Sequence, residues 1–379
     1  MRTGRCGRSA HTGLSAYYAI LAALRRGIGD RFARGVDEEG GGETEICAEN
    51  PAIVERNSMA FTVPPDRFRF EDEFRKGIAG KRVLITGAGK DGGLGQAFAL
   101  AAALNGAATV GVHFHRSHVD VFDLVRALRN QGVNAFPVQA DVTNLGDLWA
   151  TRSYVIEQMG NLPPNLVICN SGLTEKGYAF GRALREVPDE PMAMRRARVR
   201  QHFIDNLHES RLVLDTKIDG FLAMSHLWAG EAVYHNESLQ LIYVSSRQAI
   251  DPGPSVPAYV ISNWAVLQLP KVLAVNLGQA KKFVTASSIL LPFVRTGMTE
   301  EYASNPKVFG RWQPRMLETH EAAKAFAQLI ARPQAELDQG LFELLVEGSP
   351  EEIRVSWKRA HLDLREESLE WSETGALRF

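Results

Sequence analysis

The stretch RVLITGAGKDGGLGQAFALAAAL, residues 82–104, decides the fold class of this chain. It starts with a short β-branched run, turns through a glycine-rich segment at 87–95 and ends in an almost entirely apolar segment of helix length at 96–104. Such a helix has to be buried against other elements. Glycines lack Cβ atoms, so the turn is tight and its backbone approaches a pyrophosphate, whose charge the helix N-terminus stabilises. In this context the pattern predicts a dinucleotide site, although tight turns also need glycine for steric reasons alone.

Short apolar runs typical of strands continue along the chain, separated by polar or amphipathic segments of helix length. They lie at residues 109–114, 135–140, 166–169, 239–244, 284–291 and 341–346. Strands that are hydrophobic almost throughout are covered on both faces. The alternation therefore predicts an α/β protein with a Rossmann-like, doubly wound parallel sheet and helices on both faces.

Net charge, the length of apolar runs and the cysteines argue against several classes of protein. The 379 residues carry 43 Lys and Arg against 44 Asp and Glu, a net charge of −1, so no overall positive field attracts nucleic acid or an anionic membrane. The longest apolar run, residues 16–24, has nine residues, whereas a bilayer-spanning helix needs about 20. The widely separated Cys6, Cys47 and Cys169 encode neither a disulfide framework nor a zinc site. We expect a cytoplasmic protein without nucleic-acid or membrane partners.

Length alone, at about 150 residues per domain, allows two or three domains. The regular alternation instead indicates one domain at 80–348, preceded by an N-terminal extension, 1–79, that is partly flexible, and followed by a C-terminal tail, 349–379. Residues 1–29 carry five arginines and no acid, which resembles a transit peptide or a weak signal sequence. No small-residue cleavage site follows the apolar stretch in this segment, so a surface helix or a frayed extension fits equally well.

The end of the second strand-like run indicates which dinucleotide is bound. His115, Arg116 and Ser117 follow it, and no carboxylate does. A carboxylate there accepts hydrogen bonds from a ribose 2′-hydroxyl, whereas Arg offers a charge-assisted fork to a 2′-phosphate. The sequence favours NADP over NAD, with Lys90 adding charge near the same phosphate; a solvated surface Arg is the alternative. The histidines at 113–118 have no carboxylate or Cys beside them, so we expect no metal site.

Six landmarks in family order, spread over roughly residues 80–348, resemble the short-chain dehydrogenase/reductase family. They are the glycine turn after Thr86, Ala140-Asp141-Val142, Cys169-Asn170-Ser171-Gly172, Ser245-Ser246, Tyr259 and Phe293-Val294-Arg295-Thr296. In the family the second landmark contacts adenine and the last grips the nicotinamide end. The chain departs from the pattern in a glycine turn two residues longer than usual and in Leu291-Pro292, where the family has Pro-Gly.

The resemblance implies hydride transfer from a nicotinamide to a carbonyl, with Tyr259 as the proton donor. A phenol with a pKa of about 10 is a weak acid near neutral pH unless a cation lowers that pKa. The family places Lys four residues after the Tyr, on the same helix face, but this chain has Asn263 there. Lys217 occupies the position at which the family carries a catalytic Asn. The exchange resembles the ketoreductase domains of modular polyketide synthases, and it lets Lys217 supply the charge from a neighbouring helix.

The implied catalytic residues are therefore Lys217, Ser246, Tyr259 and Asn263. Ser246 precedes Tyr259 by thirteen positions, the family's usual interval, so Ser246 holds the substrate oxygen and Ser245 is a strand-end residue. The residues implied at the cofactor are Gly87, Lys90, Gly93, Leu94, Gly95, His115, Arg116, Ser117, Asp141, Val142, Asn170, Ser171, Gly172, Lys217, Tyr259 and Thr296.

Together these residues predict an NADPH-dependent ketoreductase that reduces a β-ketoacyl or polyketide-like ketone to an alcohol. The segments 110–117 and 139–142 look closer to free-standing 3-oxoacyl reductases. Two alternatives stay open. One is a short-chain reductase or dehydrogenase for another small carbonyl or alcohol, and the other is a catalytically silent protein that binds the cofactor or docks a partner.

A long insertion, at about 173–212, precedes Lys217 and carries four arginines within 195–200. These arginines match an acidic acyl carrier protein or the phosphate of phosphopantetheine or coenzyme A, but a solvated helix face is the alternative. The loop 297–314 lies where the family has its substrate lid, and its aromatic residues suit a bulky substrate or packing beneath the loop. By resemblance we expect a homo-oligomer that assembles through the helices carrying Lys217 and Tyr259.

Overall fold

The computed structural model describes residues 63–175, 185–253, 256–299, 315–349 and 352–362. The chain divides into two units, 1–56 and 57–379, and all described residues belong to the second. The expectations for the signal-like segment and for most of the lid-like loop lie outside the described residues.

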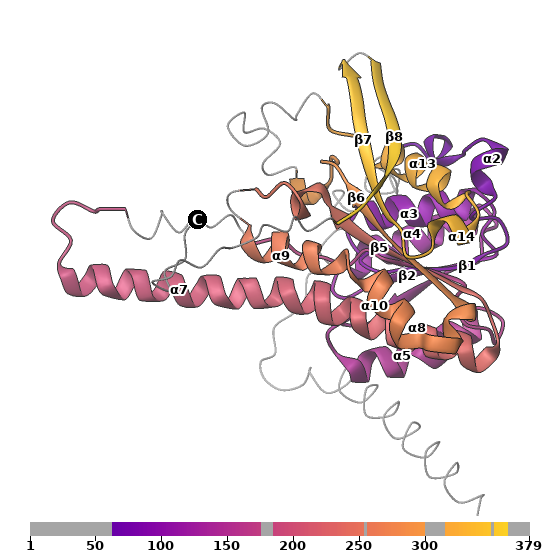
Figure 1. Cartoon of the computed structure of the whole chain (residues 1–379), viewed down its shortest axis with the longest axis horizontal. Helices are drawn as coiled ribbons and strands as arrows, with labels where there is room; N and C mark the ends of the chain where they lie inside the picture. The colour runs from indigo at the N-terminus through magenta and orange to yellow at the C-terminus, as the bar shows by residue number, and fades with distance from the viewer. Residues whose placement is uncertain (1–62, 176–184, 254–255, 300–314, 350–351, 363–379) are drawn as a thin grey trace, which may run out of the picture. The chain divides into compact units, whose positions relative to one another are not determined.

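One eight-stranded sheet forms the centre of this second unit (Figure 1). Its order is β3-β2-β1-β4-β5-β6-β7-β8, and all neighbours pair in parallel except β7 with β8, which are antiparallel. The strands are β1 (Arg82–Ile85), β2 (Thr109–Phe114), β3 (Ala135–Gln139), β4 (Leu166–Cys169), β5 (Leu239–Ser246), β6 (Val284–Leu291), β7 (Leu341–Ser349) and β8 (Glu352–Ala360). The order reverses between β1 and β4, the place at which doubly wound sheets bind ligands. The predicted parallel sheet is confirmed.

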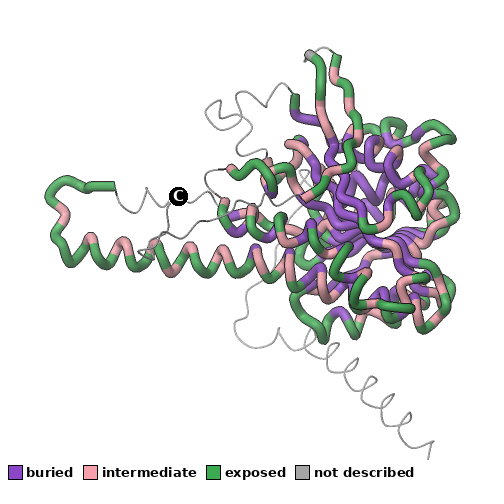
Figure 2. Tube along the Cα trace, viewed as in Figure 1, coloured by how far each residue is buried: buried purple, intermediate pink, exposed green. Residues whose placement is uncertain are grey.

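Helices cover both faces of the sheet, also as predicted (Figure 1). The helical elements are η3 (Pro65–Phe68), α2 (Asp72–Arg75), α3 (Leu94–Leu104), α4 (His118–Asn130), α5 (Leu145–Gln158), α7 (Met192–Leu214), the π-helical η4 (Asp215–Asp219), α8 (Gly220–His235), η5 (Arg247–Ala249), α9 (Pro257–Val266), α10 (Leu269–Leu277), η6 (Gly278–Phe283), α13 (Thr319–Ile330) and α14 (Gln334–Leu337). Strand β1 shows how the layers divide. Val83 and Ile85 join the core beneath α3, α4 and α13, whereas Leu84 points to the core beneath α5, α8 and α10. Figure 2 shows this burial concentrated along the sheet.

Helix α3 explains the apolar segment of the opening stretch. All its residues from Gly95 to Leu104 are buried. One side faces β1 and β2, and another packs on α13, where the rings of Phe98 and Phe326 lie 4.8 Å apart. Because alanine side chains are short, α3 fits between the sheet and α13 without leaving a solvent-exposed face.

The folded unit extends beyond the expected domain limits of 80 and 348. Phe68 and Ile78 are buried in the same core as α3. Asn105, at the end of α3, accepts a hydrogen bond from the Phe70 N–H and donates one to the Phe68 carbonyl. At the other end the sheet continues through β8, whose Trp357 Nε1 donates to the Ala325 carbonyl of α13. Neither contact could be read from the strand and helix pattern, because each joins segments far apart in the sequence.

Most of the described part of the insertion forms α7, which continues through η4 into α8. The C-terminal part of α7 packs against α9, while its N-terminal part reaches beyond the sheet (Figure 1). Met192, Phe203 and Leu207 on α7 are exposed.

The stretch from α9 through η6, Pro257–Phe283, is long and apolar enough to cross a membrane by length and composition alone. In the fold it packs on the sheet, with Val266 and Leu273 buried in the core beneath β5 and β6. Core helices pass the same test, so this stretch is weak evidence for a membrane span.

Candidate active site

The glycine turn is joined to the end of β4 by hydrogen bonds that the buried Thr86 accepts. Its Oγ1 accepts from the backbone N–H groups of Asn170, at 2.9 Å, and Ser171, at 3.0 Å. The Asn170 side chain donates in turn to the Thr86 and Gly87 carbonyls, both at 3.3 Å. A Cβ on Gly87 would lie 2.7 Å from Ser171 Cα, so only glycine allows this approach. These contacts hold the two strand ends beside the switch point together.

The N-terminus of α3 is open to a ligand. A Cβ on Gly95 would lie 2.4 Å from the Gly87 carbonyl oxygen, so glycine is needed to bring the helix close to the turn. The N-cap residue, Gly93, provides no side-chain cap, and the first turn contains no acidic residue. The first N–H groups of a helix have no intrahelical partner and carry a partial positive charge. The residues present fit the diphosphate of a dinucleotide.

Lys90 points toward the segment that follows β6. A Cβ on Gly297 would meet Lys90 Cε and Nζ, each at 2.6 Å, so the Lys90 side chain lies on Gly297. The adjacent Thr296 donates its N–H to Thr299 Oγ1 at 3.0 Å. The sequence placed Lys90 near a 2′-phosphate at the end of β2, whereas its ammonium lies at the Thr296 side of the site.

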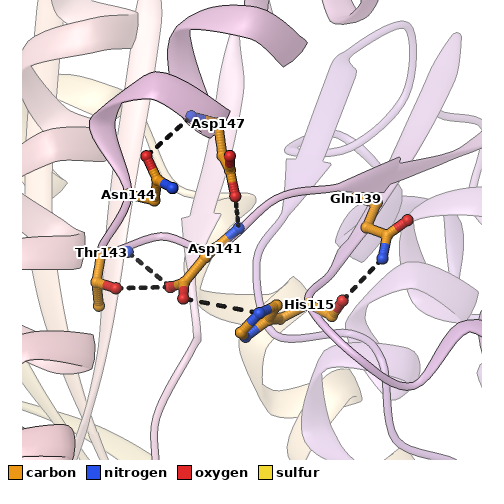
Figure 3. A network of polar contacts seen from close by, with 6 residues as sticks. All are labelled: His115, Gln139, Asp141, Thr143, Asn144 and Asp147. Atoms are coloured by element: carbon orange, nitrogen blue, oxygen red, sulfur yellow. Dashed lines mark hydrogen bonds and ion pairs between the residues drawn. The ribbon is translucent and has the colours of Figure 1, made fainter. Parts of the chain in front are cut away.

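A polar network connects the ends of β2 and β3 (Figure 3). His115 Nε2 lies 3.6 Å from Asp141 Oδ2, and Asp141 Oδ1 accepts hydrogen bonds from the N–H and the hydroxyl of Thr143. Gln139 Nε2 donates to the His115 carbonyl at 3.1 Å. Burial acts to raise the pKa of Asp141, but the Thr143 hydrogen bonds and the nearby His115 and Arg116 outweigh it, so this pKa lies below its usual value. The hydrogen bonds from Thr143 thus orient the Asp141 carboxylate, which lies where the sequence predicts a contact with adenine.

His113 points into the core from β2. Burial lowers its pKa to about 4, and neither ring nitrogen has a hydrogen-bond partner. It is therefore neutral at physiological pH. Among the described residues no group of three or more His, Cys, Asp or Glu side chains gathers as a metal site would require.

Lys217 lies in the π-helical turn η4 and is almost fully buried. Its Nζ donates to the Val244 carbonyl at 2.6 Å, near the end of β5, and lies 4.7 Å from the centre of the Phe221 ring. A Cβ on Gly172 would be 3.5 Å from this Nζ. Burial lowers the pKa of Lys217 to about 7, although the nearby Cys169 acts in the opposite direction. The structure thus places the Lys217 amine between the ends of β4 and β5.

Ser246 and Tyr259 meet on the other side of the β5 end. Burial raises the pKa of the Tyr259 phenol, while the Ser246 side chain acts to lower it. Ser245 instead donates its hydroxyl to the Asn263 carbonyl and is buried, as expected for a strand-end residue. Asn263 donates through Nδ2 to the Tyr259 carbonyl at 2.8 Å, so its amide contacts the backbone of the tyrosine.

The remaining predicted residues lie at the same edge of the sheet. Val142 packs on Gly220, where a Cβ would approach Val142 Cγ2 to 2.8 Å. Arg116 and Ser117 are exposed after β2, with Ser117 beside Gly89 of the glycine turn.

Glu175 is a residue that sequence reasoning missed. Its carboxylate accepts hydrogen bonds from the N–H groups of Ala258 and Tyr259, at the start of α9. The signal was an acidic residue shortly after Asn170-Ser171-Gly172, but the partners lie more than 80 positions downstream. Its burial was not readable from the local pattern.

Comparisons with known proteins agree with this geometry. A family model described as short chain dehydrogenase matches residues 81–307, more than half of the chain. This chain belongs to the short-chain dehydrogenase family. The match ends before β7 and β8, which complete the sheet in this short-chain dehydrogenase.

Curated relatives include reductases. Hydroxynaphthalene reductase-like protein Arp2 of Metarhizium brunneum (strain ARSEF 3297) is 26% identical over 266 residues, which cover 69% of this chain and 87% of the relative. The 3-oxoacyl-(acyl-carrier-protein) reductase FabG of Staphylococcus aureus (strain Mu50 / ATCC 700699) is 24% identical over 227 residues, covering 60% and 80%.

Solved structures support the same fold. A gluconate 5-dehydrogenase from Burkholderia cenocepacia J2315, in complex with NADP and tartrate, superposes with a TM-score of 0.55 at 17% identity, covering 74% of this chain and 96% of that one. A 3-oxoacyl-(acyl-carrier protein) reductase from Brucella melitensis ATCC 23457 gives 0.55 at 21% identity, covering 74% and 94%.

Proposed function

We propose that this short-chain dehydrogenase is an NADPH-dependent ketoreductase. The observation that carries the proposal is the set of side chains at the end of β5. They are the Tyr259 phenol, the Ser246 hydroxyl that acts to lower the pKa of this phenol, and the buried Lys217, whose Nζ donates to the Val244 carbonyl. A proton donor, a hydroxyl that holds an oxygen and a group that carries positive charge when protonated are what the reduction of a carbonyl requires.

The chain's own residues provide a place for the dinucleotide. The uncapped N-terminus of α3 at Gly93, Leu94 and Gly95 suits the diphosphate. Arg116, with His115 and Ser117, suits a 2′-phosphate. Asp141 and Val142 suit the adenine. The remaining residues, at the ends of β4 and β6 and in the glycine turn, would line the rest of the cofactor site: Asn170, Ser171, Gly172, Thr296 and Lys90. When bound, NADPH supplies the hydride.

The protein's part in the reduction is to hold an oxygen and deliver a proton. Ser246 hydrogen-bonds the carbonyl oxygen, and Tyr259 donates its phenolic proton as the oxygen gains charge. Burial raises the pKa of Tyr259 and so makes the phenol a weaker acid, which means that proton donation needs a positive charge that stabilises the phenolate. Lys217 favours the phenolate that remains, in the role that the family gives to a lysine at position 263, and Asn263 fixes the Tyr259 backbone.

A β-ketoacyl or polyketide-like ketone is the substrate class supported by the names of the relatives. An acyl carrier protein is a matching partner, because Arg196 and Arg200 on α7 are exposed, whereas Arg198 already pairs with Glu190. Homo-oligomerisation is supported by exposed apolar side chains on the helices near the site, such as Phe203 of α7, Ile261 of α9 and Val275 of α10.

The test is NADPH oxidation against a panel of β-ketoacyl thioesters and cyclic ketones, with NADH as the cofactor control. Tyr259→Phe removes only the phenolic hydroxyl and should lower kcat by about 100-fold or more, the scale of general acid catalysis, while NADPH still binds. Full activity in this variant would rule out the mechanism. NADPH binding without turnover of any ketone would favour the silent cofactor-binding alternative, and a preference for NADH would contradict the assignment of Arg116.

A further inference from the structure

Glu175 is a buried acid to which neither the family pattern nor the proposed cofactor site assigns a role. Its side chain is only 2% exposed. Oε1 accepts a hydrogen bond from the Ala258 N–H at 2.5 Å, and Oε2 accepts one from the Tyr259 N–H at 3.2 Å. Both oxygens of the carboxylate are therefore engaged by the first turn of α9.

The first turn of α9 lacks a cap of its own. Val256 at the N-cap provides no side-chain acceptor, and Pro257 follows it as the first helical residue. Ala258 and Tyr259 come next, where N–H groups have no intrahelical partner. Ala258 is buried and Tyr259 half-buried, so water is a poor substitute. Glu175 supplies the missing acceptors from the other side of the site.

The geometry requires a carboxylate rather than an amide. Within the part of the chain that the structure describes, no Lys, Arg or His side chain forms a salt bridge with Glu175, so the helix N-terminus itself compensates the buried charge. Both partners are donors. Gln at 175 would accept one hydrogen bond and turn its NH₂ group toward the other N–H, which puts two donors face to face.

The contact bears directly on Tyr259 because this residue is held at both of its backbone groups. Glu175 accepts from its N–H, and Asn263 Nδ2 donates to its carbonyl. Its phenol has to reach Ser246, which belongs to β5 and cannot follow a shift of α9. A small displacement of the first turn of α9 would therefore change the distance from the phenol to the substrate oxygen.

We propose that Glu175 is a positioning residue that holds the first turn of α9, and with it the Tyr259 phenol, in place relative to Ser246. The inference rests on the proposed role of Tyr259 as proton donor. It adds that the segment after β4 sets the geometry of proton transfer without touching the reacting atoms.

The test compares Glu175→Gln with Glu318→Gln. Glu318 caps α13 with a carboxylate in a reciprocal capping box, so the control alters the same chemistry on a helix that carries no predicted catalytic residue. The readouts are kcat and KM, NADPH affinity by fluorescence, the pH profile of kcat, and amide hydrogen exchange in the peptide spanning residues 256–266.

Glu175→Gln should lower kcat by about tenfold or more while KM and NADPH affinity stay within about threefold, because misplaced proton transfer affects the chemical step. Amide exchange at 256–266 should accelerate, and the limb of the pH profile due to the phenol should move. Glu318→Gln should leave kcat and exchange at 256–266 at the wild-type level. Glu175→Asp keeps both acceptor oxygens on a shorter side chain and should give kcat and exchange rates between those of the wild type and Glu175→Gln. The Asp variant replaces the Gln variant as the test if Glu175→Gln does not fold.

Wild-type kcat and wild-type exchange in either Glu175 variant would overturn the inference, and so would a fall in kcat matched by Glu318→Gln. The proposed function stands or falls separately, on Tyr259→Phe. If that variant keeps full activity, faster exchange in Glu175→Gln would show a structural cap and nothing more.

Discussion

Two helix N-termini face the site, and they differ in whether a side chain accepts hydrogen bonds from their first N–H groups. Helix α3 begins at glycines with no side-chain cap and no acid in its first turn. Helix α9 begins on the buried carboxylate of Glu175, which occupies two of its N–H groups. Each end carries the same partial positive charge and the same unpaired donors. The N–H groups at the open end are available to an anionic ligand, whereas those at the filled end are occupied by Glu175.

The open end can be disrupted by steric means. Gly95→Ala would place a Cβ 2.4 Å from the Gly87 carbonyl oxygen. Overpacking of this kind costs about 1–3 kcal/mol of stability. We expect α3 to move away from the turn, with NADPH affinity falling about 100-fold as measured by fluorescence titration, since its first N–H groups would lose their approach to the diphosphate.

Gly230→Ala is the matched control for that variant. Gly230 lies in α8 with nothing near its missing Cβ, so Ala there should gain up to about 1 kcal/mol from helix propensity and leave NADPH affinity unchanged. Equal NADPH affinity in the two variants would contradict a ligand-binding role for the start of α3.

The open end can also be converted into a filled one. Gly93→Asp places a carboxylate at the N-cap of α3, whose extended backbone suits an aspartate. Compared with Gly93→Ala, which shares the steric change near the Lys90 carbonyl, the Asp variant should gain about 1 kcal/mol in thermal unfolding and bind NADPH about tenfold more weakly. If the Asp variant binds NADPH as well as the Ala variant does, the charge at this end is unimportant for the ligand.

The stability of the folded protein should depend on pH through Lys217 on the catalytic side. The pKa of Lys217 is about 7 in the folded protein and 10.5 in its ordinary state, so the unfolded chain holds more protons between these values. Unfolding free energy therefore rises with pH from about 7 to 10.5, by up to about 1.4 kcal/mol per pH unit for this one group. Lys217→Met should remove that contribution, and denaturant melts across this range measure it.

Below about pH 6 Lys217 is protonated in both folded and unfolded chains, so the stability difference between wild type and Lys217→Met should be constant there. A difference that keeps changing at low pH, or an identical slope in the two proteins at high pH, would contradict the assignment of the low pKa to Lys217.

The sequence predicts the surroundings of α3 and the catalytic residues near β5 and α9 to different extents. Around β1 and α3 the sequence predicted the strand, the tight turn and the helix, because Thr86, Gly87 and Gly95 act within a short stretch of chain in which glycine spacing reports backbone geometry directly. The direction of the Lys90 side chain was not predictable, because a long side chain can reach in several directions from one loop; in the structure it lies on Gly297.

On the catalytic side the sequence identified Ser246 and Tyr259, and in the structure the Ser246 side chain acts on the pKa of the Tyr259 phenol. For Glu175 the sequence offered only an acidic residue shortly after Gly172, because the partners of its carboxylate lie on another element. The same holds for the limits of the folded unit: Phe68 and Trp357 join the α3 side of the sheet only through contacts with residues distant in the chain.

By itself, the sequence determined the order of the strands from β1 to β7, the parallel sheet and the glycine turn, because hydrophobic period and missing Cβ atoms are local properties of the chain. The tertiary structure alone decided which helix N-terminus stays open, which one receives a buried carboxylate, and how far burial lowers the pKa of Lys217. Capping across the site and desolvation depend on what surrounds a group in space, and that environment is assembled only when distant segments pack together.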